Sequence, residues 1–317
     1  MPPLFLNKNK RKRVMGKKKN KKVGGQTLIA RSISKYFPVF VLPTFVAFCI
    51  GFVWPFIQGM YLSFCKFTIP KDAEFIGIEN YVKALADPGF KHAFFYTAAF
   101  AVVSIVAINL LAFTVAYFLT QNIKGANIFR TVFFMPNLIG GIVLGYIWSM
   151  IFDAILMRYD TFLLAKTEYG FWGLVILMCW QQVGYMMIIY IAGFQSIGDD
   201  MIEAARIDGA TKWQTLLKVT IPNMMSSVTI CVFLTLTNSF KLFDQNLALT
   251  GGMPIEFQPD GSMVNTTEML ALNIYQTFYA NANSRGVGQA KAVLFFILVA
   301  IVALGQLKLT REKEVQA

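Results

Sequence analysis

Residues 169–198 read YGFWGLVILMCWQQVGYMMIIYIAGFQSIG, a stretch without a single Asp, Glu, Lys or Arg. A helix of roughly 20 predominantly apolar residues is enough to cross the hydrocarbon core of a bilayer, which is about 30 Å thick. Because this stretch exceeds that length, it predicts a membrane-spanning helix. The chain repeats the pattern on both sides of it.

Uncharged runs recur along the chain, in which 56% of residues are hydrophobic and only 15% are charged. Soluble domains carry about 25% charged residues, so this composition favours a membrane protein. The last run, 292–307, is the shortest, and we expect Lys291 and Lys308 to extend it by snorkelling toward the headgroups. We therefore predict an all-α, polytopic membrane protein with six transmembrane helices. They lie at about 37–64, 93–120, 130–152, 170–193, 220–241 and 290–308.

Two smaller features refine this picture. The segment from Met269 to Ser284 is short and rich in amide side chains, so we expect an interfacial or extracytoplasmic helix there. Gly141 and Gly145 form a pair of small residues one helical turn apart in the third run. Such a pair favours the close approach of a second helix.

The basic residues predict the orientation of the chain. An even number of spans places both termini on one side, and the tail 1–36 alone holds 12 of the 29 Lys and Arg residues. We therefore expect both termini in the cytoplasm, with 37–310 as the six-span domain, 199–222 as a cytoplasmic loop and 311–317 as a short tail. A basic tail beside a span sets topology and touches anionic lipid. Because no aromatic residue interrupts its basic run, we expect no nucleic-acid partner.

Several kinds of chemistry lack the residues that they need. His92 is the only histidine and the four cysteines show no close pairing, which excludes zinc sites and histidine-based catalytic triads. The sequence G-x-x-x-x-G-K-[ST], which cradles nucleotide phosphates, is absent. We expect no catalytic residue, metal or cofactor in this chain. A transporter built on it would need a partner that binds ATP and Mg.

The segment between the fourth and fifth runs is polar and reads EAARIDGATKWQTLLKVTIP over residues 203–222. Gly209 stands in its middle, where the end of a helix commonly needs a residue that tolerates a left-handed φ. Pro222 ends it, and proline is tolerated in the first turn of a helix. The segment therefore predicts a helix, a glycine turn and a second helix that leads into the next span.

Two pairs of residues in this loop have the spacing of a capping box, in which two side chains satisfy the free amides of a helix start. They are Asp200 with Glu203 and Thr211 with Gln214. Each pair predicts the start of one of the two helices.

The same loop closely resembles the EAA loop of bacterial ABC-importer permeases, a cytoplasmic element that docks the membrane subunit onto an ATPase. The matching residues are Glu203, Ala204, Ala205, Asp208, Gly209 and Pro222. The resemblance implies the type I ABC importer transmembrane-domain fold. It implies that Glu203 is a charged contact to the ATPase, that Gly209 is the turn, and that the two alanines are a small face seated in its groove. It also implies a second permease subunit in a heterodimer, two ATPase subunits and an extracellular substrate-binding protein.

Three further segments resemble carbohydrate-type permeases, similar to the maltose and multiple-sugar family. They are 75–90 after the first span, 129–148 in the third span and 240–254 at the end of the fifth. This resemblance implies a sugar or oligosaccharide as the transported solute and the bacterial cytoplasmic membrane as the location.

Polar residues inside two spans are candidates for the substrate path, because a polar side chain in a span costs free energy unless it is paired or solvated. The resemblance to the maltose-type permease places sugar contacts in these stretches, where amides would match hydroxyl groups and aromatic rings would offer a flat surface. The residues are Trp180, Gln181, Gln182 and Tyr185 in the fourth span and Thr235, Asn238 and Ser239 in the fifth. Hydrogen bonding between helices is the alternative role for all of them.

Alternative functions stay open at this point. Within the importer class, the solute could be a glycerol phosphate or a polyamine, although no predicted span interior offers an Arg, Lys or acid for a charged solute. Outside the class, a six-span channel or a membrane enzyme is the alternative. The sequence does not name the sugar or the partners.

Overall fold

The computed structural model describes residues 36–37, 39–121, 123–259 and 261–311, in two units, 1–59 and 60–317. A continuous helix at Val39–Leu62 starts in the first unit, and includes a π-helical turn at Cys49–Val53 ahead of α3 (Trp54–Leu62). It matches the first predicted span. The expectations for the basic tail fall outside the described residues, as does all of the C-terminal tail except Arg311.

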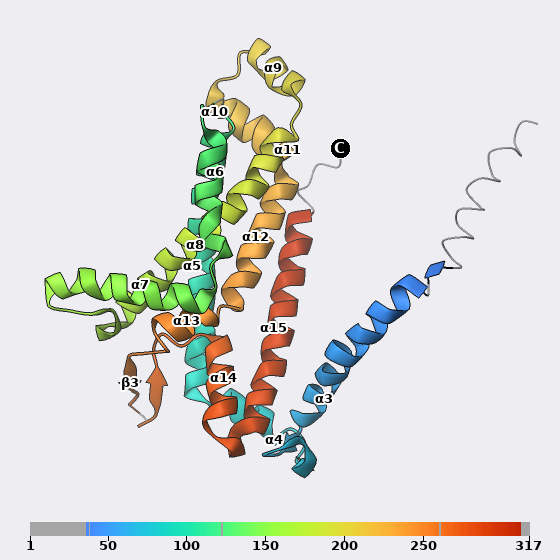
Figure 1. The fold of residues 1–317 in the computed structure, drawn as a ribbon, viewed down its shortest axis with the longest axis vertical. Coiled ribbons are helices and arrows are strands. Elements are labelled where there is room, and N and C mark those ends of the chain that lie inside the picture. The colour runs from blue at the N-terminus through green and yellow to red at the C-terminus, as the bar shows by residue number, and fades with distance from the viewer. Residues whose placement is uncertain (1–35, 38, 122, 260, 312–317) are drawn as a thin grey trace, which may run out of the picture. The chain divides into compact units, whose positions relative to one another are not determined.

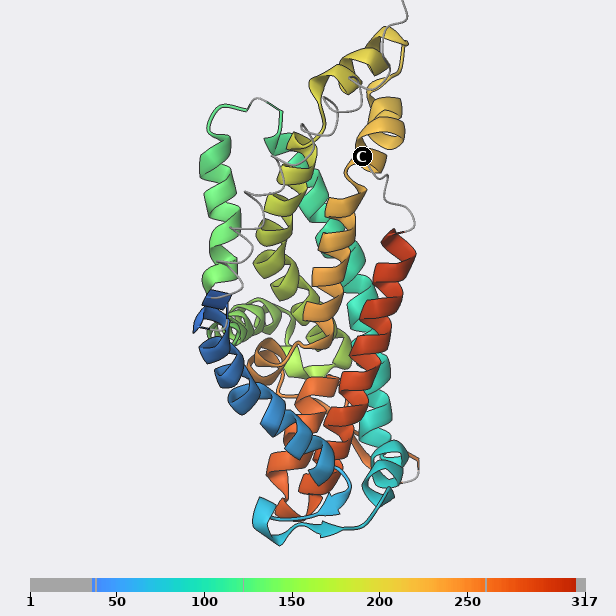
Figure 2. The same cartoon turned by 90° about the vertical axis from the view of Figure 1, so that its right-hand side faces the viewer.

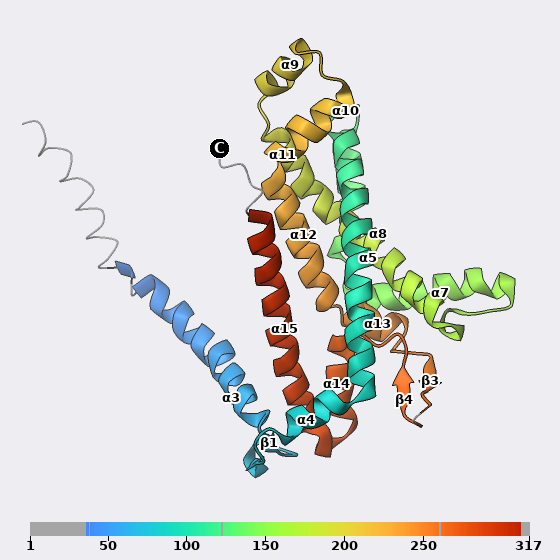
Figure 3. The same cartoon turned by 180° about the vertical axis from the view of Figure 1, so that it is seen from behind.

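Two long helices, α5 (Pro88–Leu119) and α8 (Thr167–Gln195), form the centre of the second unit (Figure 1). Both are apolar on all sides, as expected of helices in a bilayer. Seen from behind, α5 runs beside α12 (Met225–Phe240) and α15 (Arg285–Arg311) (Figure 3). The main cluster of buried side chains lies between α5, α8 and α12 and includes Phe100, Ile108, Met178, Met186 and Met187.

The third predicted span is not one continuous helix. The chain forms α6 (Ala126–Phe134), a 3₁₀ turn at Met135–Leu138 and then α7 (Gly141–Leu156), which leaves the line of α6 (Figure 1). Pro136 explains the break, because proline removes an amide hydrogen bond and its ring clashes with the preceding turn. Of the two pieces, α7 with the turn after it is the one long enough to be a candidate span.

The glycine pair predicted to pack closely does so. A Cβ atom on Gly141 would lie 2.8 Å from the Cβ atom of Asp244, and one on Gly145 would lie 2.5 Å from that of Ala248. Both neighbours belong to α13 (Asp244–Leu249), a short helix that packs along α7.

The fifth predicted span is bent. A helical arm, Lys212–Asn223, meets α12 at an angle of 72°, and the break is at Met224. With this pair taken as one span, the described residues hold six candidate spans, and without it five. The expected all-α, polytopic fold class is confirmed.

Short elements close the end of the second unit that lies opposite the polar loop (Figure 1). The segment expected to be a short helix outside the hydrocarbon core is α14 (Leu270–Ala280), which packs on α15 and α5. The strands form two small antiparallel pairs. The strands are β1 (Cys65–Lys66), β2 (Glu74–Phe75), β3 (Ile255–Phe257) and β4 (Met263–Asn265). The other helix at this end is α4 (Glu79–Ala86), with 3₁₀ turns at Pro70–Asp72 and Ala282–Ser284. Two more 3₁₀ turns, Met157–Tyr159 and Leu163–Ala165, connect α7 to α8.

Lys291 does not snorkel to the headgroups, contrary to the sequence expectation. Its side chain is only 1% exposed, and its Nζ donates to Asp87 Oδ2 at 2.5 Å, Asn273 Oδ1 at 2.8 Å and Thr277 Oγ1 at 2.7 Å. The expectation was wrong because α14 and the start of α5 fold over this end of α15 and supply enough polar partners to hold the ammonium group inside.

Candidate functional site

The polar loop projects beyond the ends of α12 and α15 in both side views (Figure 1, Figure 2). It consists of α9 (Asp199–Ile207), a turn, and an arm made of α10 (Lys212–Thr215), a π-helical turn at Leu216–Thr220 and α11 (Ile221–Asn223). The sequence prediction of two helices joined by a turn is confirmed.

Gly209 forms the turn with φ +78°, in the left-handed region as predicted. The amide of Ala210 donates to the Ala205 carbonyl at 3.0 Å, and that of Gly209 donates to the Arg206 carbonyl at 3.1 Å. These two bonds make a Schellman motif, in which glycine avoids the steric cost of a left-handed residue. The direction in which the chain leaves α9 is therefore fixed by hydrogen bonds.

Only one of the two predicted capping boxes is present. Thr211 and Gln214 form it. The backbone N–H of Gln214 donates to Thr211 Oγ1 at 3.3 Å, and the backbone N–H of Thr211 donates to Gln214 Oε1 at 2.8 Å. The prediction for Asp200 with Glu203 is wrong, because α9 begins at Asp199 and its N-cap is Gly198, two residues before the predicted cap. Asp200 instead lies in the first turn, where its negative charge favours the positive end of the helix dipole.

Pro222 lies in the first turn of α11, as expected, although the chain bends only at Met224. Proline removes one backbone hydrogen bond from a helix, and the π-helical turn directly before it is the local adjustment. Such turns occur frequently at functional sites. The arm therefore stays helical through the proline.

Apolar side chains are exposed on the surface of this loop. Ile207 is 86% exposed and Trp213 72% exposed. Glu203, Ala204 and Asp208 are exposed beside them, and Ala205 is half-buried. Large exposed apolar side chains rimmed by polar ones mark interaction surfaces.

The polar residues of the fourth span do not form one group. Gln181 is buried and bonded on both sides: its Nε2 donates to the Ile139 carbonyl at 3.2 Å, and its Oε1 accepts from Gln245 Nε2 at 2.7 Å. Tyr185 is half-buried against the main apolar cluster. Trp180 is 43% exposed and meets the ring of Trp148 edge to face, with centroids 5.6 Å apart.

One pair from the two spans does come together. Asn238 Nδ2 of α12 donates to Gln182 Oε1 of α8 at 3.4 Å, and both side chains are partly exposed. Thr235 and Ser239 are buried, and their hydroxyls donate to carbonyls of α12 one turn earlier at 2.8 Å. The amide pair is thus more open to a ligand than the two hydroxyls.

Sequence reasoning missed Asn109 on α5. Its Nδ2 donates to Thr235 Oγ1 at 3.2 Å and its Oδ1 accepts from the Tyr190 hydroxyl at 2.8 Å, so that α5, α8 and α12 are joined. A single amide inside the predicted span 93–120 was the available signal. Its partners lie far apart in the sequence and could not be read from it.

A family model described as "Binding-protein-dependent transport system inner membrane component" matches residues 108–311. The chain belongs to this family of transport permeases. That assignment places the polar loop and the bent fifth span inside the shared region, and it makes the chain a multi-pass membrane protein of a transport system.

Relatives of this permease include carbohydrate systems. It is 43% identical to the "probable starch degradation products transport system permease protein AmyD" of Thermoanaerobacterium thermosulfurigenes, over 88% of this chain and 94% of the relative. It is 29% identical to the "multiple sugar-binding transport system permease protein MsmF" of Streptococcus mutans, over 90% and 99%. The resemblance to carbohydrate-type permeases is confirmed.

A solved structure supports the same fold. A chain of a bacterial ABC transporter involved in the import of the acidic polysaccharide alginate matches with a TM-score of 0.73 and 18% identity. The match covers 90% of this permease and 98% of that chain. At this identity the match supports the fold, which is that of an ABC importer transmembrane domain.

Proposed function

We propose that the permease forms the translocation path of an ATP-driven importer for a sugar or oligosaccharide delivered by an extracellular binding protein. The observation that carries the proposal is the projecting loop, with its fixed glycine turn and its exposed Ile207 and Trp213. The loop would dock on a separate ATPase, which binds ATP and Mg. A second permease subunit and two copies of the ATPase would complete the assembly.

Coupling would proceed through the helical arm. When the ATPase subunits close on ATP, they would displace α9, and the Schellman turn at Gly209 would pass this movement to Lys212–Asn223. The bend at Met224 would then convert the displacement into a tilt of α12. Hinges of this kind, a few residues between rigid elements, commonly carry such transitions. Glu203 would supply a charged contact and Ala204 a small one.

The chemistry of the amide pair, Gln182 and Asn238, favours a sugar over a charged solute. Gln182 and Asn238 present uncharged donors and acceptors, and Trp180 offers a partly exposed ring nearby in the sequence. A glycerol phosphate or polyamine would need an available charge beside this pair, within the spans. Lys291 is the buried cation among the residues that the structure describes, and Asp87 already neutralises it.

Changing Ile207 to Asp tests the docking of the loop. We expect at least about tenfold weaker co-purification of the ATPase, because the centre of an interface commonly depends on a few apolar side chains. Sugar uptake should fall in parallel. Ile78 is 68% exposed at the far end of the second unit, so Ile78→Asp is the matched control. Equal retention of the ATPase by both variants, or no ATPase with the unchanged protein, would contradict the proposal.

Alanine at Gln182 or Asn238 tests the substrate path. We expect KM for uptake to rise about tenfold, since a lost hydrogen bond to a sugar hydroxyl leaves its partner unsatisfied, while thermal stability stays nearly constant. Gln181→Ala is the contrasting variant. It leaves Gln245 and the Ile139 carbonyl without a partner, so that its melting temperature should fall. An unchanged KM in both Gln182→Ala and Asn238→Ala would show that these two amides have a purely structural role.

A further inference from the structure

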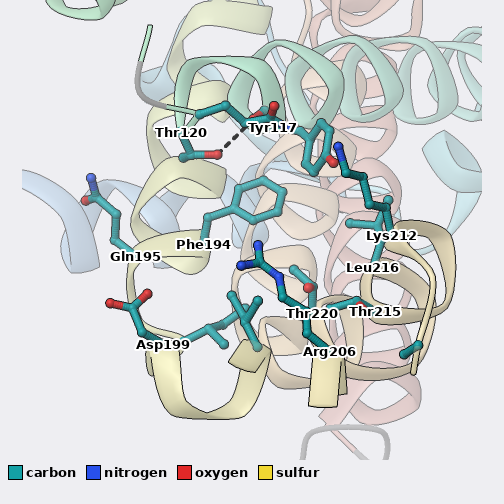
Figure 4. Close-up of a pocket in the computed structure, with 14 residues that line it drawn as sticks. Tyr117, Thr120, Phe194, Gln195, Asp199, Arg206, Lys212, Thr215, Leu216 and Thr220 are labelled. Atoms are coloured by element: carbon teal, nitrogen blue, oxygen red, sulfur yellow. Dashed lines mark hydrogen bonds between the residues drawn. The ribbon is translucent and has the colours of Figure 1, made fainter. Parts of the chain in front are cut away.

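A hollow of about 610 Å³ lies between the inner side of the polar loop and the adjoining ends of α5 and α8 (Figure 4). One wall is formed by Tyr117 of α5, Gln121 just after the end of α5, and Phe194 of α8. Arg206 and Lys212 of the loop form the other wall. Pockets of roughly 300–1,000 Å³ hold ligands of metabolite size. The transport proposal assigns no role to this space.

Two cations in this hollow have no anionic partner. Among the residues that the structure describes, neither Arg206 nor Lys212 has a carboxylate within ion-pair distance. The one carboxylate in the lining is Asp199. In the close-up, the charged ends of Arg206 and Lys212 lie toward the rings of Phe194 and Tyr117, while Asp199 lies on the far side with Gln195 (Figure 4). The hollow therefore has a positive side.

The remaining lining suits hydroxyl groups. The rings of Tyr117 and Phe194 have centroids 6.0 Å apart and close one side. Gln121 and Gln195 also line the hollow, and their side-chain amides make no hydrogen bond within the described part of the chain. Two side-chain amides and an aromatic wall beside two cations match a ligand that carries both hydroxyl groups and a phosphate.

We propose that this hollow binds a phosphate group, either that of a soluble sugar phosphate or that of an anionic lipid headgroup. The Arg206 guanidinium offers a planar fork that binds phosphate oxygens in pairs, and Lys212 adds a point charge. Because the walls belong both to the loop and to the spans, the bound ligand ties the two together and restrains the arm. The binding is independent of the transport function, whereas its effect on uptake rests on the proposed coupling.

The first test measures binding to the purified full chain in a neutral detergent. Glucose 6-phosphate is the probe and glucose the control that lacks the phosphate. We expect saturable binding of glucose 6-phosphate at least about tenfold tighter than that of glucose, because charge-assisted hydrogen bonds are the stronger ones. The double variant Arg206→Gln, Lys212→Gln should weaken it at least about tenfold. Lys218, an exposed cation of the same arm outside the hollow, gives the matched control Lys218→Gln.

The second experiment distinguishes the two sources of the phosphate group. The chain is placed in phosphatidylcholine nanodiscs with or without phosphatidylglycerol, and co-purified lipid is quantified. If the ligand is a lipid, phosphatidylglycerol is enriched by the unchanged protein and by Lys218→Gln but not by the double variant, and glucose 6-phosphate does not bind. If neither probe binds in a way that depends on Arg206 and Lys212, the proposal is overturned.

A third measurement tests the restraint itself in vesicles of the complete importer. Glucose 6-phosphate on the loop side should slow sugar uptake severalfold in the unchanged protein and not in the double variant. Binding without this effect would overturn the restraint. Failure of the importer to assemble would count against the transport proposal alone, because the two binding experiments use the chain without its partners.

Discussion

The variant Asp87→Ala should lose about 3–5 kcal/mol of stability, the usual cost when one partner of a buried ion pair is removed. Lys291 would then lose its carboxylate partner while its side chain stays 1% exposed. Asp87 also caps α5, since its Oδ1 accepts from the Gly89 amide at 2.9 Å, and a lost cap costs about 1 kcal/mol more. Thermal unfolding of the purified protein in detergent measures the loss.

Two companion variants separate the charge from the cap. Asp87→Asn keeps an N-cap side chain and removes only the negative charge, so it should lie between the unchanged protein and Asp87→Ala. Lys291→Met should cost less than Asp87→Ala, because Asp87 is 36% exposed and water can solvate it. A larger loss for Lys291→Met than for Asp87→Ala would contradict this account.

A neighbouring carboxyl belongs to the same network. Burial raises the pKa of Glu268, while the hydrogen bond from Asn273 and the charge of Lys291 oppose the rise. Its Oε2 accepts from Asn273 Nδ2 at 3.0 Å. Lys291 thus neutralises one acid and lowers the cost of burying a second one.

The variant Gly184→Ala should prevent the normal packing of α6 on α8. A Cβ atom at this position would lie 1.8 Å from the carbonyl oxygen of Phe133 and 2.3 Å from its carbonyl carbon. Side chains can rotate away from an added methyl group, but a backbone carbonyl cannot do so without moving its helix. We therefore expect a loss above the roughly 1–3 kcal/mol of ordinary overpacking, seen as a low yield of folded protein and a lowered melting temperature.

Gly140→Ala is the control for this experiment. Gly140 has nothing within 4 Å of an added Cβ, and its φ of −61° suits any residue. It should fold and melt like the unchanged protein. Normal yield and melting of Gly184→Ala would show that α6 does not pack against α8 as the structure has it.

The local structure of the polar loop could be predicted because it depends on neighbours in the sequence. The left-handed turn at Gly209 follows from the freedom of glycine, and the capping box of Thr211 with Gln214 follows from a spacing of three. Asp200 was misplaced because helix ends are the least certain feature of a sequence pattern. Lys291 was misjudged because its partners come from two other helices.

The candidate substrate residues show the same limit. The pattern of apolar runs was sufficient to place Gln181, Gln182 and Asn238 in membrane spans. It could not tell that Gln181 bonds to Gln245 while Gln182 faces Asn238, since a one-residue step on a helix turns a side chain by about 100°. Their roles in transport stay predictions.

By itself the sequence determined that the protein lies in a membrane, how many apolar runs it has, and the local structure of the polar loop. These follow from length, charge and residue spacing, which are local properties. The tertiary structure decided where the runs break, at Pro136 and at Met224, and which polar groups find partners. It also gathered Arg206 and Lys212 over the ends of α5 and α8. Such pairings join residues far apart in the chain, and their energies depend on burial that only the packed helices create.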